Sequence, residues 1–416
     1  MSQVISEKIN PNRISREPFG LKAESSLNRI TLNPSSASPG ETLYINIPKL
    51  AESVVIVPNS VALLFNIALT GGSDKHANNR FVNNLAACMK SRYKINFGGE
   101  TIQDTNRYDL YKLYSDLHLT KKERENKIRE GISGVNMHKL RAGAGDKVSS
   151  DAKEVALAAV YNTKYRLPLD HPILDNHGVF YPKSLDQSLI FEITLPESKD
   201  LVITSDNTKP HTYAISNLEL EYQSISSDYL ANEAKSAYQI GKGFYYEYLT
   251  LHKTFTINKA TDSILNQNIN IPRRSMTGIL MLFTEAYVAG ARDSEKFVNP
   301  SITSIKVNVD GVPNRLYSKG MDATDFYHSV TKRFGVSDNI AIKDYYSDKF
   351  ALWIDLRTYH DNSIHGNGLH ISNTRDGVHL EMKRKVGGSG TITCFMFVVA
   401  DALMEVMNSN LRSIMY

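Results

Sequence analysis

Alternating apolar and polar residues recur along this chain, and residues 301–334 show the pattern most clearly. From Ile305 to Asp310, isoleucine and valine occupy every second position between polar residues. Because successive side chains of a β-strand point to opposite faces, this pattern predicts a strand with one buried face and one hydrated face. Asp310 and Gly311 favour a hairpin turn, and Asn314–Tyr317 is predicted to be the returning strand.

A helix is predicted after the hairpin, which ends at Gly320. Apolar residues recur every four positions, as on one face of an α-helix: Phe326, Val330 and Phe334. Asp322 or Thr324 is expected to cap the amino end of this helix, because either side chain can accept a hydrogen bond from a free backbone amide. Lys332 and Arg333 lie near the carboxyl end, where positive charge is favourable.

The same strand–turn–strand–helix unit is predicted earlier in the chain. Tyr93–Phe97 alternates like a strand, Glu100–Gln103 is its return, and Asp104–Asn106 is a polar break. The helix that follows has one apolar face: Leu110, Leu113, Tyr114 and Leu117. Lys-Ile-Asn from Lys94 matches Lys-Val-Asn from Lys306, which indicates an internal duplication.

A second pair of segments supports the duplication, because Phe350–Leu356 resembles Phe191–Leu195 in its order of apolar and acidic residues. Further strands are predicted in both halves of the chain, at residues 43–47, 61–69, 218–222, 244–257, 279–286, 378–382 and 391–400. Strands and helices do not alternate as parallel sheets require. The predicted fold class is therefore all-β, with two tandem antiparallel eight-stranded jelly-roll β-sandwiches and short inserted helices.

Changes in composition predict the domain boundaries. Residues 1–29 are polar and mixed in charge, so we expect an N-terminal polar arm that becomes ordered only on a partner. Residues 30–226 are predicted to form the first jelly roll and residues 244–416 the second. Residues 227–243, a helix-compatible stretch that ends in glycines, are the predicted linker.

The segment Cys394–Val399 is apolar at every position instead of alternating. It is predicted to lie in a sheet covered on both faces, either inside a sandwich or at the contact between the halves. Cys394 is expected to be a buried free thiol, and no disulfide with Cys88 is predicted because the two lie far apart in the sequence.

Charge and targeting signals narrow the function classes. The 416 residues include 48 basic and 44 acidic residues, a formal charge of +4, which lacks the dense basic character of nucleic-acid-binding proteins. The first 20 residues lack the apolar core of a signal peptide, and the apolar run Cys394–Ala400 is too short to span a bilayer. We therefore expect no sequence-specific nucleic-acid partner and a soluble product that is intracellular when made.

Histidines are the main candidates for metal chemistry in a jelly-roll protein. His379 and Glu381 share one face of a predicted strand, as an iron site of two histidines and one carboxylate requires, but no histidine follows His379. His360, His365 and His370 lie in a predicted loop and share no face. We expect them to be solvated, and no metal site is predicted.

The remaining candidates also favour a structural role. Gly131–Ser150 is rich in glycine and serine but lacks the spacing of a phosphate loop, so an exposed insertion loop is expected. Asp355 with Arg357 is expected to be an ion pair or a solvent-facing strand position. No serine-elbow or cysteine–histidine signature occurs. We predict no catalytic residues, no cofactor and no enzyme activity.

Longer segments resemble a known family. They are IKVNVDGVPNRLYSKGMDATDFYHSV, ALWIDLRT, HGNGLH and CFMFVVADALMEVMNSNLRSIMY in the second half, and HGVFYPKSLDQSLIFEITL, YAISNLELEY and GKGFYYEYLTLHKT before them. In this order, over most of residues 30–416, they resemble the double jelly-roll major capsid proteins of Polinton-like viruses, adintoviruses and virophages.

This resemblance implies a major capsid protein of a double-stranded DNA virus, located in the virion. It implies that three chains form a pseudo-hexameric capsomer and that such capsomers tile an icosahedral shell. The implied partners are the chain itself, neighbouring capsomers, and penton and minor capsid proteins. Candidates for the variable loops at the top of the rolls are Glu123–Lys164 and Arg357–Arg375. No catalytic residues are implied.

Two alternatives stay open at this point. A two-domain β-sandwich carbohydrate-binding protein would carry a concave patch of aromatic and acidic residues and would be a monomer or dimer. A jelly-roll oxygenase or isomerase would need a bound metal.

Overall fold

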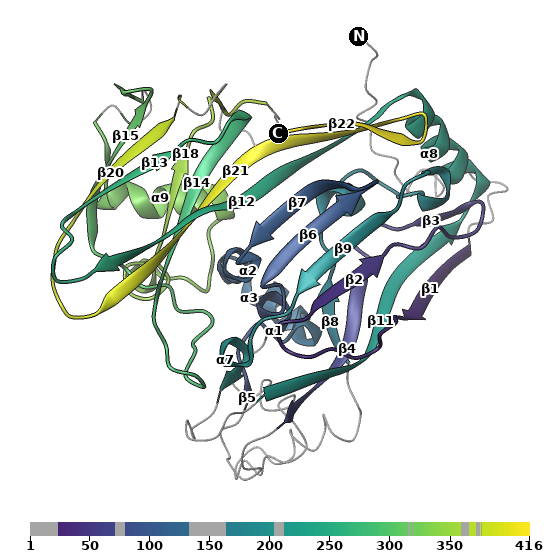
Figure 1. The fold of residues 1–416 in the computed structure, drawn as a ribbon, viewed down its shortest axis with the longest axis horizontal. Helices are drawn as coiled ribbons and strands as arrows, with labels where there is room; N and C mark the ends of the chain where they lie inside the picture. Colours follow the sequence, from purple (N-terminus) through teal and green to yellow (C-terminus); the bar gives the residue numbers. More distant parts are fainter. Residues whose placement is uncertain are drawn as a thin grey trace.

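The computed structural model describes residues 24–70, 80–132, 164–203, 212–314, 317, 319–358, 366–371, 375 and 377–416. Two β-sandwiches lie side by side, and each is built from consecutive strands of the chain (Figure 1). The ladders between the strands of these residues are antiparallel.

The first sandwich contains strands β1 to β11. Their bounds are β1 Glu24–Thr31, β2 Thr42–Asn46, β3 Val54–Ile56, β4 Ala62–Thr70, β5 Arg80–Phe81, β6 Arg92–Phe97, β7 Glu100–Asn106, β8 Tyr165–Pro168, β9 Leu189–Thr194, β10 Val202–Ile203 and β11 Thr212–Ser226. The helices are α1 Leu85–Cys88, α2 Tyr108–Leu117, α3 Lys121–Asn126, η2 Ile128–Glu130, α6 Pro172–Asp175, η3 Pro182–Ser184 and α7 Ser198–Leu201. One sheet has the strand order β1-β11-β4-β8 and the other β2-β9-β6-β7.

The second sandwich follows helix α8, Asp228–Ile240. Its strands are β12 Lys242–Asn258, β13 Ile264–Ile269, β14 Arg273–Glu285, β15 Ile302–Val309, β16 Val312–Pro313, β17 Met321–Asp322, β18 Ala351–Asp355, β19 Leu369–Ile371, β20 Val378–Arg384, β21 Thr391–Met407 and β22 Asn410–Met415. Its helices are α9 Ala323–Phe334 and α10 Ile342–Tyr345. The sheet orders are β12-β21-β14-β18 and β13-β20-β15-β16.

The two sandwiches have the same topology. Strands β1, β2, β4, β6, β7, β8, β9 and β11 correspond in order to β12, β13, β14, β15, β16, β18, β20 and β21, because each set pairs in the same way. Helices α2 and α9 also occupy corresponding positions in the chain, between β7 and β8 and between β16 and β18. Eight antiparallel strands in two four-stranded sheets of this order form a jelly roll. The predicted fold class is confirmed.

One cross-strand ion pair recurs in both sandwiches and supports the duplication. Lys94 on β6 lies opposite Glu192 on β9, with 3.3 Å between Nζ and Oε2. Lys306 on β15 lies opposite Glu381 on β20, at 3.7 Å. The two Lys-x-Asn sequences therefore also occupy corresponding positions in the two sandwiches.

The predicted correspondence between Phe350–Leu356 and Phe191–Leu195 is wrong. Phe350–Leu356 contains β18, which pairs with β14, whereas Phe191–Leu195 lies largely in β9, which pairs with β6. The counterpart of β9 is β20, because both lie beside the strand that carries the Lys-x-Asn sequence. Any half-buried strand alternates, so alternation alone does not identify a strand's neighbours.

The hairpin after β15 turns more tightly than the sequence suggested. Asp310 and Gly311 both have positive φ, 51° and 78°, as a two-residue turn requires. Val309 then pairs directly with Val312, so the return strand is Val312–Pro313, and the prediction of Asn314–Tyr317 is wrong.

The predicted cap of α9 is confirmed. Asp322 accepts a hydrogen bond from the Thr324 amide at 2.8 Å and forms a capping box with Asp325. Phe326 and Val330 lie on the buried face of the helix, as its four-residue apolar period predicted.

Two further predictions need correction. The polar break at Asp104–Asn106 is part of β7, because Gln103 and Thr105 donate hydrogen bonds to the Leu249 carbonyl of the second sandwich. Residues 24–29 of the predicted arm belong to β1, since their backbone pairs with β11. The rest of the arm lies outside the described residues.

Strands β12 and β21 reach from the second sandwich to the first. They pair from Lys242 with Val406 to Asn258 with Thr391, and β22 extends the ribbon on the far side of β21 (Figure 1). At the tip of the ribbon, the Leu411 amide donates to the Gln187 side chain at 3.0 Å. The second sandwich is thereby anchored on the first.

We predict that Gly278→Ala destabilises the second sandwich. A methyl group at Gly278 on β14 would lie 2.4 Å from the Trp353 ring and 2.7 Å from the Ile354 carbonyl oxygen. Overpacking of this kind costs about 1–3 kcal/mol, to be measured by urea unfolding with the fluorescence of Trp353, the only tryptophan. Gly387→Ala is the matched control, because a methyl group there contacts nothing within 4 Å. Equal stability of the two variants would contradict the prediction.

Candidate functional site

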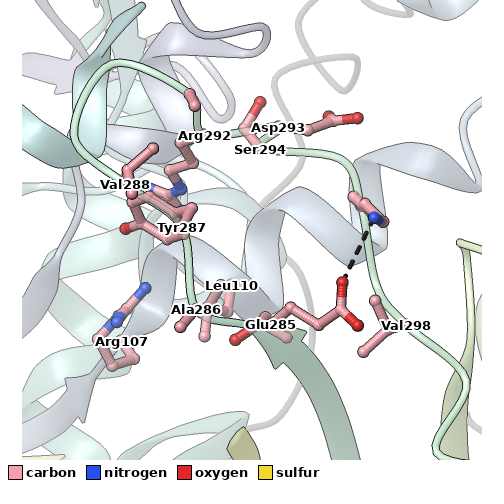
Figure 2. A pocket seen from close by; sticks show the side chains of 13 residues that line it. Arg107, Leu110, Glu285, Ala286, Tyr287, Val288, Arg292, Asp293, Ser294 and Val298 are labelled. Carbon is pink, nitrogen blue, oxygen red and sulfur yellow. Dashed lines mark hydrogen bonds and ion pairs between the residues drawn. The ribbon is translucent and has the colours of Figure 1, made fainter. Parts of the chain in front are cut away.

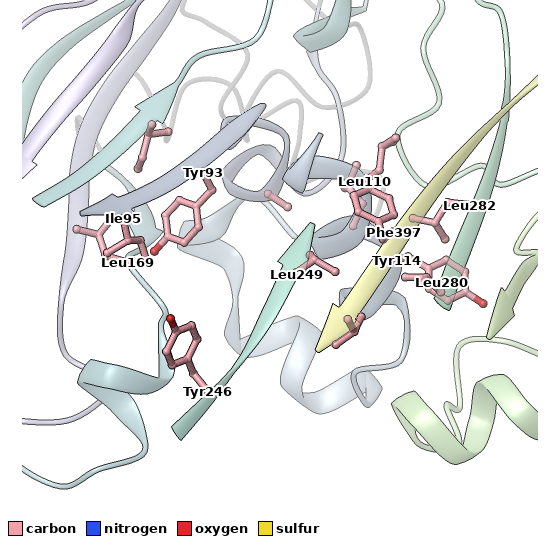
Figure 3. Packing of buried hydrophobic residues seen from close by; sticks show 14 of the residues in the cluster. Tyr93, Ile95, Leu110, Tyr114, Leu169, Tyr246, Leu249, Leu280, Leu282 and Phe397 are labelled. Atoms are coloured by element: carbon pink, nitrogen blue, oxygen red, sulfur yellow. The ribbon is translucent and has the colours of Figure 1, made fainter. Parts of the chain in front are cut away.

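The contact between the two sandwiches brings together residues that lie far apart in the sequence. Helix α2 of the first sandwich lies on the outer face of the sheet β12-β21-β14-β18. Figure 3 shows Leu110 and Tyr114 of α2 beside Phe397, Leu280 and Leu282 of that sheet. The rings of Tyr111 and Phe397 are 6.5 Å apart.

This contact explains the apolar run near the C-terminus. Every residue from Cys394 to Ala400 is buried, because alternate side chains face α2 and the core of the second sandwich. The prediction of a sheet covered on both faces is confirmed. Cys394 is buried and free, as expected, and Cys88 is also buried and free.

An ion pair between the sandwiches lies next to this apolar contact. Asp109, at the start of α2, pairs with Arg292 of the β14–β15 loop at 3.0 Å and with Arg107 at 3.0 Å. The side chains of Asp109 and Arg292 are both 4% exposed. Burial alone would raise the pKa of Asp109, but the two guanidinium groups outweigh burial and hold this pKa below its usual value. Arg292 also donates to the Asp200 carbonyl at 2.8 Å.

An open cavity of about 560 Å³ lies beside this ion pair. Figure 2 shows Arg107 and Leu110 from the first sandwich facing the β14–β15 loop, which contributes Tyr287 and Arg292. Most charged groups on its wall have a partner: both arginines contact Asp109, and Lys296 lies 3.5 Å from Glu285. The lining residues belong to the two sandwiches where they meet, and they include no histidine or cysteine.

Polar contacts extend along β12, where it crosses the first sandwich. The Leu249 carbonyl accepts from Gln103 at 2.7 Å and from Thr105 at 2.6 Å. The Tyr246 hydroxyl donates to the Ile102 carbonyl at 2.9 Å. These bonds join the edge strand β7 to β12, so the edge is covered and not exposed to other chains.

Three histidines of the first sandwich are buried against the second. The His118 ring stacks on Phe334 with centroids 5.2 Å apart, and its Nδ1 lies 3.0 Å from the Gly335 carbonyl. His171 lies 5.1 Å from the Tyr246 ring. His177 Nε2 lies 2.8 Å from the Tyr245 carbonyl oxygen.

Burial lowers the pKa of two of these imidazoles. The pKa of His118 is lowered mainly by burial, against a hydrogen bond to the Gly335 carbonyl that raises it. The pKa of His171 falls to about 3, because burial and the neighbouring His177 outweigh the attraction of Asp170. At neutral pH both rings are therefore uncharged.

The histidines that the sequence singled out do not meet at one site. His379 is hydrogen-bonded to the Asn268 side chain, its strand neighbour Glu381 pairs with Lys306, and His370 lies 3.1 Å from the Arg274 carbonyl. His360 and His365 lie outside the described residues. Among the residues that are described, no group of three or more histidine, cysteine or acidic residues could hold a metal ion.

The remaining candidates are placed as follows. Asp355 and Arg357 form the predicted ion pair at 2.8 Å, but it is buried and does not face solvent. Of Gly131–Ser150, only residues 131 and 132 are described, and the two candidate top loops Glu123–Lys164 and Arg357–Arg375 are described only in part. No helix in the described part of the chain is long and apolar enough to cross a membrane.

Sequence reasoning missed the residues that join the two sandwiches. An acidic residue in the first turn of a helix is favourable by itself, so Asp109 carried no special signal. Its partner Arg292 is 183 positions away. His171 and His177 lie in a proline- and glycine-containing segment that gave no sign of burial.

Comparison with known proteins places this geometry in a fold family. No family model matches the sequence, and no curated protein matches it. The PBCV-1 virus capsid structure matches 96% of this chain and 98% of its own, with a TM-score of 0.60 and 12% identity. The chain has the double jelly-roll fold of viral major capsid proteins.

Two further solved structures agree. The Faustovirus major capsid protein matches 94% of this chain and 91% of its own, at a TM-score of 0.60 and 9% identity. The mavirus major capsid protein matches 94% of this chain and 90% of its own, at a TM-score of 0.53 and 10% identity. The likeness therefore includes both jelly rolls.

We predict that Asp109→Ala destabilises the protein by about 3–5 kcal/mol, because it leaves the buried Arg292 guanidinium without its full compensation. The measurement is urea unfolding of the two proteins at pH 7. Asp104→Ala is the control, because it breaks a largely exposed pair with Arg92 that is worth about 1 kcal/mol or less. A loss for Asp109→Ala no larger than that of the control would count against this role.

We also predict that acid weakens the protein through His171. Its pKa is about 3 in the folded state and 6.5 in the unfolded state. The stability that the neutral imidazole gives the folded state is therefore complete above pH 6.5 and is lost as the pH falls. Between pH 7 and pH 5 the loss is about 2 kcal/mol. Asp175 acts oppositely, because burial raises its pKa to about 6 and its protonation then favours the folded state.

The matched variant for this prediction is His171→Asn. The His171 side chain accepts from the Ile173 amide at the start of α6, and asparagine is also a good helix cap. Unfolding of both proteins at pH 7 and pH 5 isolates the histidine from Asp175, which both retain. The assignment is wrong if the free energy of unfolding of the wild type falls between pH 7 and pH 5 by no more than that of the variant.

Proposed function

We propose that the chain is the major capsid protein of a double-stranded DNA virus. The observation that carries this proposal is the presence of two eight-stranded jelly rolls in one chain, which match solved capsid proteins over nearly their whole length. Sequence resemblance to the capsid proteins of Polinton-like viruses, adintoviruses and virophages points to the same role. The protein acts by self-association and has no catalytic part in this role.

The assembly unit in this proposal is a homotrimer. Two similar sandwiches in each chain give three copies six nearly equivalent parts, which suits a position with six neighbours in a shell. Such pseudo-hexameric capsomers tile an icosahedral shell in the virion, together with penton and minor capsid proteins. The formal charge of +4 on 416 residues permits dense packing without strong repulsion between copies.

The proposed domain plan has four parts. Residues 24–226 and 242–416 are the two jelly rolls, residues 227–241 join them, and residues 1–23 form the arm. This plan is supported by the pairing of the strands, since β1 to β11 and β12 to β22 form separate sheets.

The direct test is the mass of the purified full-length protein by light scattering, with negative-stain imaging of the same fraction. We expect three times the 46.6-kDa chain mass and a hexagonal outline. A protein that stays monomeric at every concentration, and binds glycans in an array, would overturn the capsid proposal in favour of the carbohydrate-binding alternative.

A further inference from the structure

The cavity beside the ion pair of Asp109 and Arg292 has the size of a small-molecule binding site. Its volume is about 560 Å³, and ligand sites in proteins commonly measure roughly 300–1,000 Å³. Helix α2 and the β14–β15 loop form its walls, so it lies where the two sandwiches meet (Figure 2). Boundaries between domains are a frequent position of such sites.

The Arg107 side chain on the wall of this cavity is held by Asp109 through one edge only. Its Nε and Nη2 donate to the two carboxylate oxygens of Asp109 at 3.0 and 3.1 Å. Its Nη1 donates to no group among the described residues, and Figure 2 shows the guanidinium pointing toward the β14–β15 loop. A guanidinium is a planar fork of five donors, so the edge formed by Nη1 and Nη2 can hold a second carboxylate. Asp109 orients this edge.

The backbone at Arg107 is unusual for a residue that carries a side chain. Its φ is 53°, in the left-handed region, which is uncommon for residues other than glycine. Such conformations are strained and are concentrated at functional sites. The backbone would favour glycine at this position, so the side chain accounts for the arginine.

The rest of the wall combines a second cation with apolar surface. Lys296 is 47% exposed and lies 3.5 Å from Glu285. Lys259 holds Glu285 more closely, because its hydrogen bond is the main cause that lowers the pKa of that carboxyl group. The apolar surface comes from both sandwiches: Leu110, Ala286 and Val298. The wall therefore offers positive charge next to an apolar surface.

We propose that this cavity binds a small amphipathic carboxylate, with one carboxyl group on a short apolar chain. The carboxylate accepts hydrogen bonds from the outer edge of Arg107, and the chain lies against Leu110 of α2 and Val298 of the β14–β15 loop. The ligand contacts both sandwiches, so its binding stabilises their joint by mass action. This inference does not depend on the capsid role, because it concerns a contact within one chain.

The chemistry of the wall favours this class of ligand over others. An amine would be repelled by Arg107 and Lys296. An alcohol would accept a hydrogen bond from Arg107 but would not offset its charge, and hydrogen bonds between two charged groups are about twice as strong. A hydrocarbon without a polar end would take water away from the guanidinium and give it no acceptor.

The first measurement is thermal unfolding of the full-length protein with straight-chain carboxylates from acetate to decanoate, below the concentrations at which they form micelles. We expect the unfolding temperature to rise with ligand concentration, and more for octanoate than for acetate, because the longer chain buries more apolar surface. Octylamine and octanol are the matched probes, and neither is expected to equal octanoate. Equal effects of these three molecules, or no effect of any carboxylate, would overturn the inference.

Two variants locate the site by isothermal titration calorimetry with octanoate. Arg107→Gln removes the guanidinium and leaves Arg292 to compensate Asp109, and we expect it to weaken binding by about 10-fold or more. Ala286→Phe fills the cavity from an exposed position and leaves the ion pair unchanged, so it tests the site independently of the first variant. Arg92→Gln is the control, because Arg92 also pairs with an aspartate but does not line the cavity.

Methyl NMR spectra report directly where octanoate binds. With labelled leucine and valine methyl groups, we expect octanoate to shift the resonances of Leu110, Val288 and Val298, which come from both sandwiches. Saturable binding that leaves these three resonances unchanged would place the ligand elsewhere and overturn the inference.

The variants decide the remaining outcomes. Weaker binding in both Arg107→Gln and Ala286→Phe, with binding retained in Arg92→Gln, supports the inference, provided that Trp353 fluorescence shows each variant to be folded. Binding to both cavity variants as strong as to the wild type would refute it. Neither result changes the proposed capsid role, which the mass of the oligomer tests separately.

Discussion

The structure depends on one constraint: the sheet β12-β21-β14-β18 is apolar on both faces where Ile279–Phe283 of β14 pairs with Cys394–Val398 of β21, so this part must be covered on both sides. Its inner face is covered by the second sheet of its own sandwich. Its outer face, with Phe397, Leu280 and Leu282, is covered by α2 of the first sandwich (Figure 3). At roughly 25 cal/mol for each Å² of apolar surface removed from water, exposure of this face would be strongly unfavourable. The two jelly rolls are therefore one folding unit in practice.

Polar groups give this contact its orientation. An apolar surface alone would allow α2 to slide, whereas Asp109 with Arg292, and the Leu249 carbonyl with Gln103 and Thr105, are satisfied in only one arrangement. Buried ion pairs add little net stability relative to apolar residues, but breaking one leaves an uncompensated charge. Their contribution here is to fix the position of one sandwich relative to the other.

The sequence was sufficient for local structure and insufficient for pairing. The alternation from Ile305 to Asp310 and the cap at Asp322 were predictable, because they depend on neighbours within a few residues. Strands β13, Ile264–Ile269, and β22, Asn410–Met415, were missed because asparagine, glutamine and arginine interrupt their apolar pattern. Such strands are specified by the backbone of the strand beside them, which a local pattern does not reveal.

The residues that join the two sandwiches could not be predicted from the sequence for the same reason. Nothing near Asp109 in the sequence distinguishes it from an ordinary first-turn aspartate, and the burial of His118 and His171 depends on Phe334 and Tyr246, which belong to the other sandwich. The run Cys394–Ala400 was the one sequence signal of this contact, because only a doubly covered strand has no polar face.

The most direct test of the account is an electron cryo-microscopy reconstruction of the purified oligomer at a resolution that shows side chains. We expect three copies around a threefold axis, each with its α2 on its own β21. A reconstruction in which copies meet through identical surfaces about a twofold axis, or in which α2 has left the sheet β12-β21-β14-β18, would contradict it.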